Sequence, residues 1–280
     1  MEEVRADDYK NPIVVQSNVL IRSAYTMTLL EKRLLMLAMS KINTSVIPKK
    51  NELIEVAVHR DEWSKIYKES NPWRDLNLAA DRLLGRVLII NPTKEKAYKK
   101  KLNWTDSCEY YENKVIIKFG YSISSLIAGL YAEFTQADLL DVAKLDSFYA
   151  VRLYELIKQY QSTGFLFITV EEFRIITKTE DKYSQFFQLN QRVIKPVVES
   201  INKKIPSLKL NVEYVKQKYS RSVTSLKFSF KKTNQPDLNQ DTSGKNSNYV
   251  DKQVILPEET PRQKRARITE SVMNIEDTDW

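Results

Sequence analysis

The order of helix-like and strand-like hydrophobic patterns in residues 28–119 occurs a second time in residues 146–230. In the first copy, Thr28 lies three residues before Glu31, the spacing of a capping box, and an amphipathic pattern continues to Lys41. A strand is expected next at residues 53–58, followed by helices at 61–68 and 72–85. Three strand-forming stretches follow, at residues 86–90, 100–110 and 114–119. We expect strand 86–90 to pair with residues from the last two stretches.

The second copy repeats this order and ends in a hairpin. Its helices are expected at residues 146–160, 171–177 and 184–204, and its strands at 165–170, 208–215 and 223–230. In the hairpin, Leu210 and Val212 alternate with Lys209 and Asn211, which indicates one covered face. Helix, strand, helix, helix and hairpin is the order of a winged helix, a variant of the helix-turn-helix. We therefore expect an α+β chain of two tandem winged-helix domains with a flexible C-terminal tail, arising from an internal duplication.

Positive charge is concentrated in the second copy. The chain has 44 Lys+Arg and 36 Asp+Glu, a net charge of +8. Residues 182–232 alone hold 12 Lys+Arg against two acidic residues, Glu199 and Glu213, a net charge of +10. A merely solvated surface normally intersperses both signs, so this excess favours a face that binds a polyanion.

The third helix of a winged helix enters the major groove of DNA, and the wing contacts the backbone or the minor groove. Residues 184–204 are therefore the expected recognition helix of the second copy. Side chains that suit hydrogen bonding to bases are Gln185, Gln188, Asn190, Gln191 and Arg192. Side chains that suit phosphate oxygens are Lys182, Tyr183, Ser184 and Lys195, with Lys216, Lys218 and Arg221 in the wing loop. An exposed helix face and a solvated turn are the alternatives.

Pro196 falls inside this expected helix and lacks the N–H that a helix interior needs. Either the helix kinks there, or it begins nearer Lys195. The sequence leaves both open.

The first copy is less suited to reading DNA. Its third helix carries Asp75 and Asp81, which would face phosphates unfavourably. Its expected wing is basic enough to hold a DNA backbone, through Lys99, Lys100 and Lys101. We expect this copy to serve chiefly in dimerisation, with auxiliary DNA contact.

The scarcest residue types exclude several kinds of chemistry. Cys108 and His59 are the only cysteine and histidine, so a disulfide framework, a cysteine zinc site and a histidine-pair metal site cannot form. The five glycines fit neither common phosphate-binding loop. The apolar runs are too short for a membrane span, and no secretory signal is recognisable. We expect a cytoplasmic protein that is not an enzyme and needs no cofactor or metal.

Residues 134–160 carry a distinctive run, in which a phenylalanine–threonine pair and a leucine-rich stretch precede Ser147, Tyr149, Ala150, Arg152, Leu153, Tyr154, Glu155 and Leu156. This run resembles the signature of iteron-binding plasmid replication initiators. Residues 165–177, 192–202 and the opening stretch 15–39 are also similar to that family. The resemblance covers about residues 13–232, and Pro196 matches its pattern.

The resemblance implies initiation of theta-type replication of a plasmid or plasmid-like circle. Partners implied are double-stranded origin DNA with directly repeated iterons, a second copy in a homodimer that represses its own gene, and the host initiator, helicase and primase. The expected segments are a flexible N-terminus (1–12), the first domain (13–133), the second domain and main DNA reader (134–232), and a linker and tail (233–280) with a short helix at 261–275.

Other functions remain open from the residues alone. A tandem winged-helix transcriptional repressor is the first alternative, and would bind one palindromic operator. The second alternative, a rolling-circle nickase, would need a metal held by a pair of histidines, and this chain has one histidine. The third, a nucleic-acid binder without sequence preference, would bind origin DNA and random DNA with the same affinity.

Overall fold

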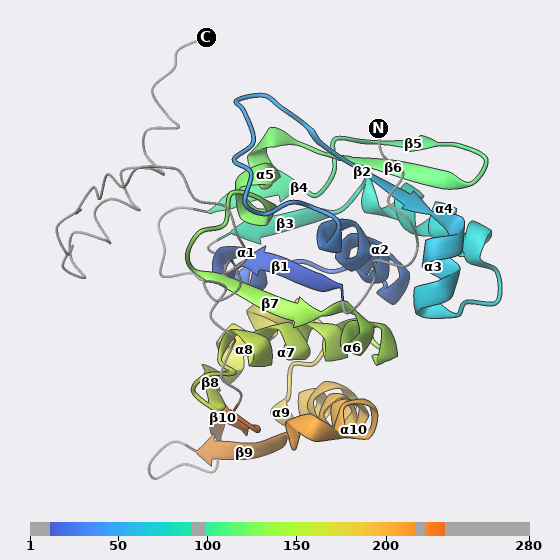
Figure 1. The fold of residues 1–280 in the computed structure, drawn as a ribbon. Coiled ribbons are helices and arrows are strands. Elements are labelled where there is room, and N and C mark those ends of the chain that lie inside the picture. The colour runs from blue at the N-terminus through green and yellow to red at the C-terminus, as the bar shows by residue number, and fades with distance from the viewer. Residues whose placement is uncertain (1–11, 91–98, 217–221, 233–280) are drawn as a thin grey trace, which may run out of the picture. The chain divides into compact units, whose positions relative to one another are not determined.

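The computed structural model describes residues 12–90, 99–216 and 222–232 (Figure 1). The expected tail 233–280, its helix 261–275 and nearly all of the expected N-terminal segment 1–12 lie outside the described residues. Within the described ranges, no helix combines the length and apolarity needed to cross a membrane.

The first copy folds as a winged helix. Helix α2 (Leu29–Ser40) begins at Thr28, whose side chain accepts the Glu31 N–H, while Glu31 accepts the Thr28 N–H, so the expected capping box is confirmed. Strand β2 (Ile54–His59) and helices α3 (Arg60–Tyr67) and α4 (Pro72–Leu83) follow. The hairpin of β5 (Ser107–Tyr110) and β6 (Lys114–Phe119) pairs with β2 in the antiparallel order β2-β6-β5.

The second copy has the same arrangement. Helix α7 (Phe148–Gln159) precedes β8 (Phe165–Thr169), α8 (Val170–Thr177) and a long third helix. Strands β9 (Asn211–Lys216) and β10 (Val223–Ser229) form the wing in the order β8-β10-β9. This order matches β2-β6-β5, and an aromatic residue is buried at the corresponding helix of each copy, Trp63 on α3 and Phe173 on α8. The chain is therefore a pair of winged helices.

One expectation about the first copy is only partly confirmed: strand 86–90 pairs with residues of the stretch 100–110 but not with the stretch 114–119. Strand β3 (Val87–Ile90) pairs with β4 (Lys100–Asn103) and, through Ile89, forms a single bridge with Ala24, but it pairs with neither β5 nor β6. The two form a separate ribbon inserted between α4 and the wing, and β6 cannot pair with β3 because β2 and β5 already occupy both its edges. The wing of the first copy is thus β5–β6, and Lys99, Lys100 and Lys101 belong to the inserted ribbon.

Further elements surround the expected boundary between residues 133 and 134. Strand β1 (Ile13–Ser17) pairs antiparallel with β7 (Phe134–Asp138), and short helices α1 (Asn18–Arg22), α5 (Tyr121–Ile127) and α6 (Leu139–Lys144) complete this layer. Residues from both expected domains therefore share one small sheet. The exact division of the domains stays a prediction.

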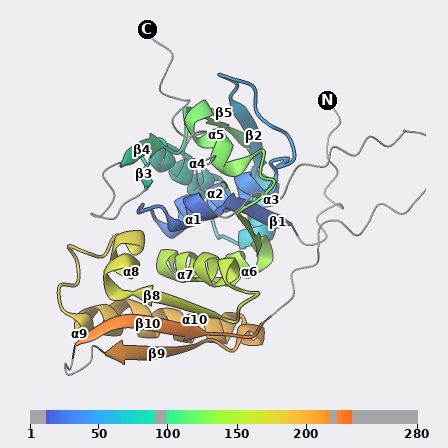
Figure 2. The same ribbon diagram turned by 90° about the vertical axis from the view of Figure 1, so that its left-hand side faces the viewer.

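Helix α7 lies between the two halves (Figure 2). It contacts α1 and β7 on one side and α10 (Lys195–Lys204) and β8 on the other, and nine of its residues are buried. A helix that is buried nearly all round belongs to the centre of a core. The two winged helices therefore share a continuous core that is built around α7.

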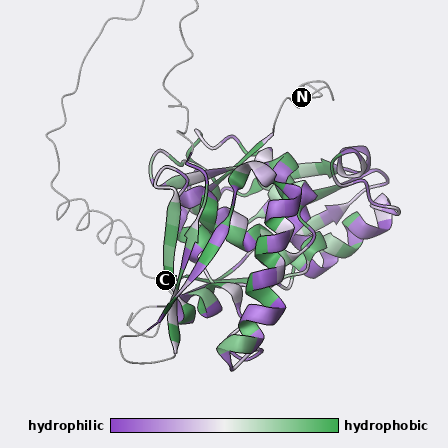
Figure 3. Cartoon of the chain, turned by 90° about the horizontal axis from the view of Figure 1, so that it is seen from below, coloured by the Kyte–Doolittle hydropathy of each residue, from purple (hydrophilic) through white to green (hydrophobic). Residues whose placement is uncertain are grey.

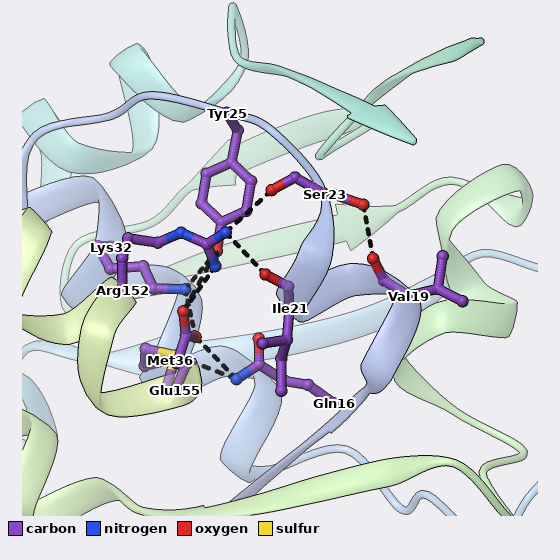
Figure 4. A network of polar contacts seen from close by, with 9 residues as sticks. All are labelled: Gln16, Val19, Ile21, Ser23, Tyr25, Lys32, Met36, Arg152 and Glu155. Atoms are coloured by element: carbon purple, nitrogen blue, oxygen red, sulfur yellow. Dashed lines mark hydrogen bonds and ion pairs between the residues drawn. The ribbon is translucent and has the colours of Figure 1, made fainter. Parts of the chain in front are cut away.

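A charged network is buried where α7 meets the first half (Figure 4). Glu155 Oε1 accepts hydrogen bonds from Lys32 Nζ at 2.7 Å and from Gln16 Nε2 at 2.8 Å, while its Oε2 lies 2.8 Å from Arg152 Nη1. The Arg152 guanidinium lies 4.1 Å from the Tyr25 ring centroid and donates to the Ile21 and Ser23 carbonyls. The Lys32, Arg152 and Glu155 side chains are fully buried. This network joins β1, the end of α1 and the segment after it, α2 and α7.

Candidate nucleic-acid interface

The third helix of the second copy runs without a break from Phe186 to Lys204, beginning two residues later than expected. It consists of α9 (Phe186–Leu189), a π-helical turn (Asn190–Ile194) and α10. The Lys195 N–H donates to the Asn190 carbonyl, five residues back, directly before Pro196. A wider turn accommodates the missing N–H and the bulk of a proline ring, so the helix passes through Pro196. The alternative of a helix beginning near Lys195 is thereby excluded.

One side of this helix is buried and the other is exposed. Leu189, Val193, Ile194, Val197 and Ile201 enter the core. Two adjacent phenylalanines begin the helix: Phe186 packs against the core, whereas Phe187 is 69% exposed. The exposed stripe, as we call it, consists of Gln188, Gln191, Arg192, Lys195, Glu199 and Lys203. Figure 3 shows hydrophilic (purple) and hydrophobic (green) residues alternating along the helices seen from below.

Four of the expected contact residues meet on this stripe: Gln188, Gln191, Arg192 and Lys195. Within the described part of the chain, their side chains form no hydrogen bond or ion pair with other residues. Their polar groups therefore face solvent and are free to bind a ligand. Amide and guanidinium groups spaced along one helix face fit the hydrogen-bonding edges of the major groove.

The segment before the helix is held in place by α8. Arg174 donates to the carbonyls of Tyr183 and Ser184, the latter at 3.2 Å. Lys182, Ser184 and Gln185 are exposed there, while Tyr183 is half-buried. Arg174 therefore fixes where the recognition helix starts, a role for which the sequence holds no local signal.

Asn190 differs from the other expected base-reading residues. It is half-buried, and its Oδ1 accepts the Tyr214 hydroxyl of β9 at 2.9 Å. The Tyr214 ring also packs edge-on against Phe186, at 5.7 Å between centroids. Asn190 thus fastens the wing to the recognition helix, which leaves its amide less available to a base.

Replacing Tyr214 with phenylalanine tests this fastening. The change keeps the ring contact with Phe186 and removes the hydroxyl, so we expect the free energy of unfolding to fall by about 1 kcal/mol. Urea unfolding followed by circular dichroism measures the change, with Tyr131→Phe as a control because that hydroxyl bonds an exposed loop carbonyl. Equal stability of the Tyr214 variant and the wild-type chain would contradict the assignment.

The wing of the second copy is described only at its base. Lys216 is exposed at the end of β9, whereas Lys218 and Arg221 lie outside the described residues. In the first half, Lys99 and Lys101 are exposed on the inserted ribbon and Lys100 is partly buried. These three lysines come from the opposite half of the fold, apart from the exposed stripe.

The acidic residues of α4 take structural roles. Asp75 is buried beside Arg74, and Asp81 accepts the Tyr110 hydroxyl at 2.5 Å. Burial is the main cause that raises the pKa of Tyr110, and the hydrogen bond to the Asp81 carboxylate raises it further. His59 is exposed at the N-terminus of α3, and burial raises the pKa of the Cys108 thiol to about 11. Among the described residues, no group of three His, Cys, Asp or Glu side chains could hold a metal ion.

Two winged helices in tandem, the second with an exposed polar and basic recognition helix, define a class of DNA-binding protein. Comparison with family models identifies the family within that class. Residues 13–158 match the model described as "Initiator Replication protein, WH1", and residues 169–230 match "Initiator Rep protein, WH2". The chain belongs to this family of replication initiators, as its signature run suggested.

Individual relatives agree with the family. A "Replication initiation protein" of Escherichia coli is 23% identical over 233 residues, covering 81% of this chain and 72% of the relative. A "Probable replication protein rep" of Bifidobacterium longum (strain NCC 2705) is 32% identical over 96 residues, covering 34% of this chain and 32% of the relative. Among solved structures, the "Pi initiator protein in complex with iteron DNA" has a TM-score of 0.64 at 21% identity, covering 79% of this chain and 97% of that one. The structural match establishes the fold.

Proposed function

We propose that this protein initiates replication of a plasmid or plasmid-like circular DNA by binding directly repeated sites in its origin. The main support for this function is the exposed stripe, whose free amide, guanidinium and ammonium groups lie on the third helix of the second winged helix. The membership in the replication-initiator family supports this function. So does the net charge of +10 over residues 182–232.

In this proposal the two halves have different tasks. Gln188, Gln191 and Arg192 read base edges, while Lys182, Ser184, Lys195 and the wing with Lys216, Lys218 and Arg221 hold phosphates. Tyr183, Gln185 and Asn190 position these groups or contact DNA at the edge of the site. The first half adds backbone contact through Lys99, Lys100 and Lys101 and forms the homodimer. The protein performs no chemistry of its own, and it recruits the host initiator, helicase and primase while its dimer represses its gene.

A replication assay separates an initiator from a repressor. DNA flanking the gene is joined to a selectable marker on a circle without another origin, and the gene is supplied separately in the host. We expect transformants only when the intact gene is present. Failure to maintain the circle, together with repression of a reporter joined to the same DNA, would favour the tandem winged-helix repressor.

Glu199 provides a test of the exposed stripe by charge. It is the only acidic residue between Phe186 and Lys204, and it lies on the same face as Arg192 and Lys195. We expect Glu199→Gln to bind duplex DNA roughly two- to fivefold more tightly at low salt, because a carboxylate near phosphates is removed. Fluorescence anisotropy with a labelled duplex measures the change.

The matched control is Glu171→Gln, which removes an exposed carboxylate from α8. It is expected to change the affinity for DNA much less. If both variants gain equally, only net charge matters and the stripe does not face DNA.

A further inference from the structure

Five exposed lysines gather at the end of the second winged helix where α10 finishes, and we call this group the lysine end. They come from three parts of the chain: the last turn of α10, the turn before β9 and the residues after β10. The members are Lys203, Lys204, Lys209, Lys231 and Lys232. Lys203 is also the last member of the exposed stripe, whereas the other four lysines lie outside it.

Backbone and amide hydrogen bonds bring these three parts together. Asn202 bonds both the N–H and the carbonyl of Leu210, which closes the turn that carries Lys209. The Lys231 N–H donates to the Leu208 carbonyl at 2.7 Å, and the Phe230 N–H donates to the Gly164 carbonyl. The lysine end is therefore a fixed arrangement of positive charge on an ordered turn.

These lysines have no carboxylate partner within the described residues, in contrast to lysines elsewhere in the fold. Lys227 pairs with Glu213, and Lys118 lies between Glu55 and Glu109. Lys203 and Lys204 lie in the last turn of α10, where a positive charge is stabilised by the negative end of the helix dipole. This accounts for the presence of two of the five lysines. The dipole does not explain Lys209, Lys231 or Lys232, which lie outside the helix.

The position of the lysine end relative to the exposed stripe suggests its ligand. Arg192, Lys195, Glu199 and Lys203 recur at intervals of three or four residues, so the stripe leads directly into the lysine end. Figure 2 shows α9 at one end of the second winged helix and the end of α10 at the other. From Phe186 to Lys204 the helix is roughly 28 Å long, more than twice the width of the major groove.

We propose that the lysine end binds the phosphate backbone beyond the groove that α9 occupies, an inference that rests on the proposed function. Base edges are read near Arg192, and the far end of the same helix holds the backbone of the flanking DNA. The contact extends the binding site beyond the base pairs that are read and carries no sequence preference.

A triple variant of the full chain tests the proposal: Lys203→Gln, Lys204→Gln and Lys209→Gln. The control is Lys49→Gln, Lys50→Gln and Lys68→Gln, three exposed lysines of the first half. Lys68 is a close match for Lys209, since both residues have left-handed backbone, with φ of 52° and 49°. Binding to a duplex from the flank of the gene is measured over a range of salt concentrations, and hydroxyl-radical protection is mapped on the same duplex.

Each lost phosphate contact lowers the slope of log affinity against log salt by about 0.9, so the triple variant should lose about 2–3 from the slope. Protection should disappear at one edge of each site, while the ratio of specific to random binding stays unchanged. A slope and a footprint equal to those of the control variant would overturn the proposal. If the wild-type chain shows no sequence preference, the proposed function fails. In that case, a smaller salt slope in the triple variant would still show that the lysine end binds DNA, as a general DNA-binding surface.

Discussion

Replacing Glu155 with glutamine is expected to lower the free energy of unfolding by about 3–5 kcal/mol, the range for breaking a buried ion pair on one side. The substitution keeps the shape of the side chain and removes its charge. Lys32 and Arg152 then remain fully buried without a counter-ion, in the core that joins the two winged helices. Urea unfolding of the full chain measures the loss.

The control for this variant is Glu172→Gln at the rim of the same junction. Glu172 pairs with Arg22, and both side chains are about a third exposed, with 31% for Arg22 and 32% for Glu172. Solvent screens such a pair, so we expect a loss below about 1 kcal/mol. Equal losses in the two variants would show that the buried network does not hold the halves together.

The pH dependence of stability gives a second readout for Glu155. Burial acts to raise the pKa of this carboxyl, but Lys32, Arg152 and the hydrogen bond from Gln16 outweigh burial and lower it. A carboxyl with a lowered pKa stabilises the fold fully above its unfolded value of about 4.3, and the contribution is lost as pH falls through the folded value. Below about pH 4 the wild-type chain should therefore lose stability more steeply than Glu155→Gln.

Replacing Arg192 with alanine is expected to weaken binding to the specific site by about 1–3 kcal/mol, or roughly 5- to 150-fold. The side chain is exposed on the stripe and has no partner among the described residues, so the fold should be unaffected. A guanidinium that pairs with a guanine edge discriminates between bases. Binding to random duplex DNA should therefore fall much less than binding to the specific site.

Lys195→Ala is the comparison, since Lys195 lies one turn further along the same face. As a phosphate contact, it should weaken specific and random binding equally. If Arg192→Ala also weakens both equally, Arg192 holds a phosphate and does not read a base. If neither variant changes affinity, the exposed stripe does not contact DNA.

Much of the fold could be predicted because local patterns and tertiary contacts agree. The capping box at Thr28 and Glu31 and the alternating wing strands are local signals, and each marks an element found in the structure. The expectations that strand 86–90 also pairs with residues 114–119 and that Lys99, Lys100 and Lys101 belong to the wing were wrong. Strand partners depend on which edges are free, and a periodic pattern does not reveal this. Strands β1 and β7 are about 120 residues apart in the sequence, so no local signal links them.

The candidate site could be predicted in outline but not in detail. Side-chain type singled out Gln188, Gln191, Arg192 and Lys195 as contact candidates, and the structure shows all four exposed on the same helix. The position of Asn190 against Tyr214 depends on the wing packing onto the helix, a contact between distant residues. The buried network had a visible signal, since Arg152 and Glu155 are the only charged residues in the stretch 148–157 of α7, but their partner Lys32 lies 123 residues from Glu155.

The most direct test is protection mapping of the full chain on the DNA that flanks its gene. The proposed function predicts several short protected sites of equal spacing and the same orientation, each lost with Arg192→Ala. A single palindromic site, or uniform protection without sequence preference, would contradict binding of direct repeats by the exposed stripe.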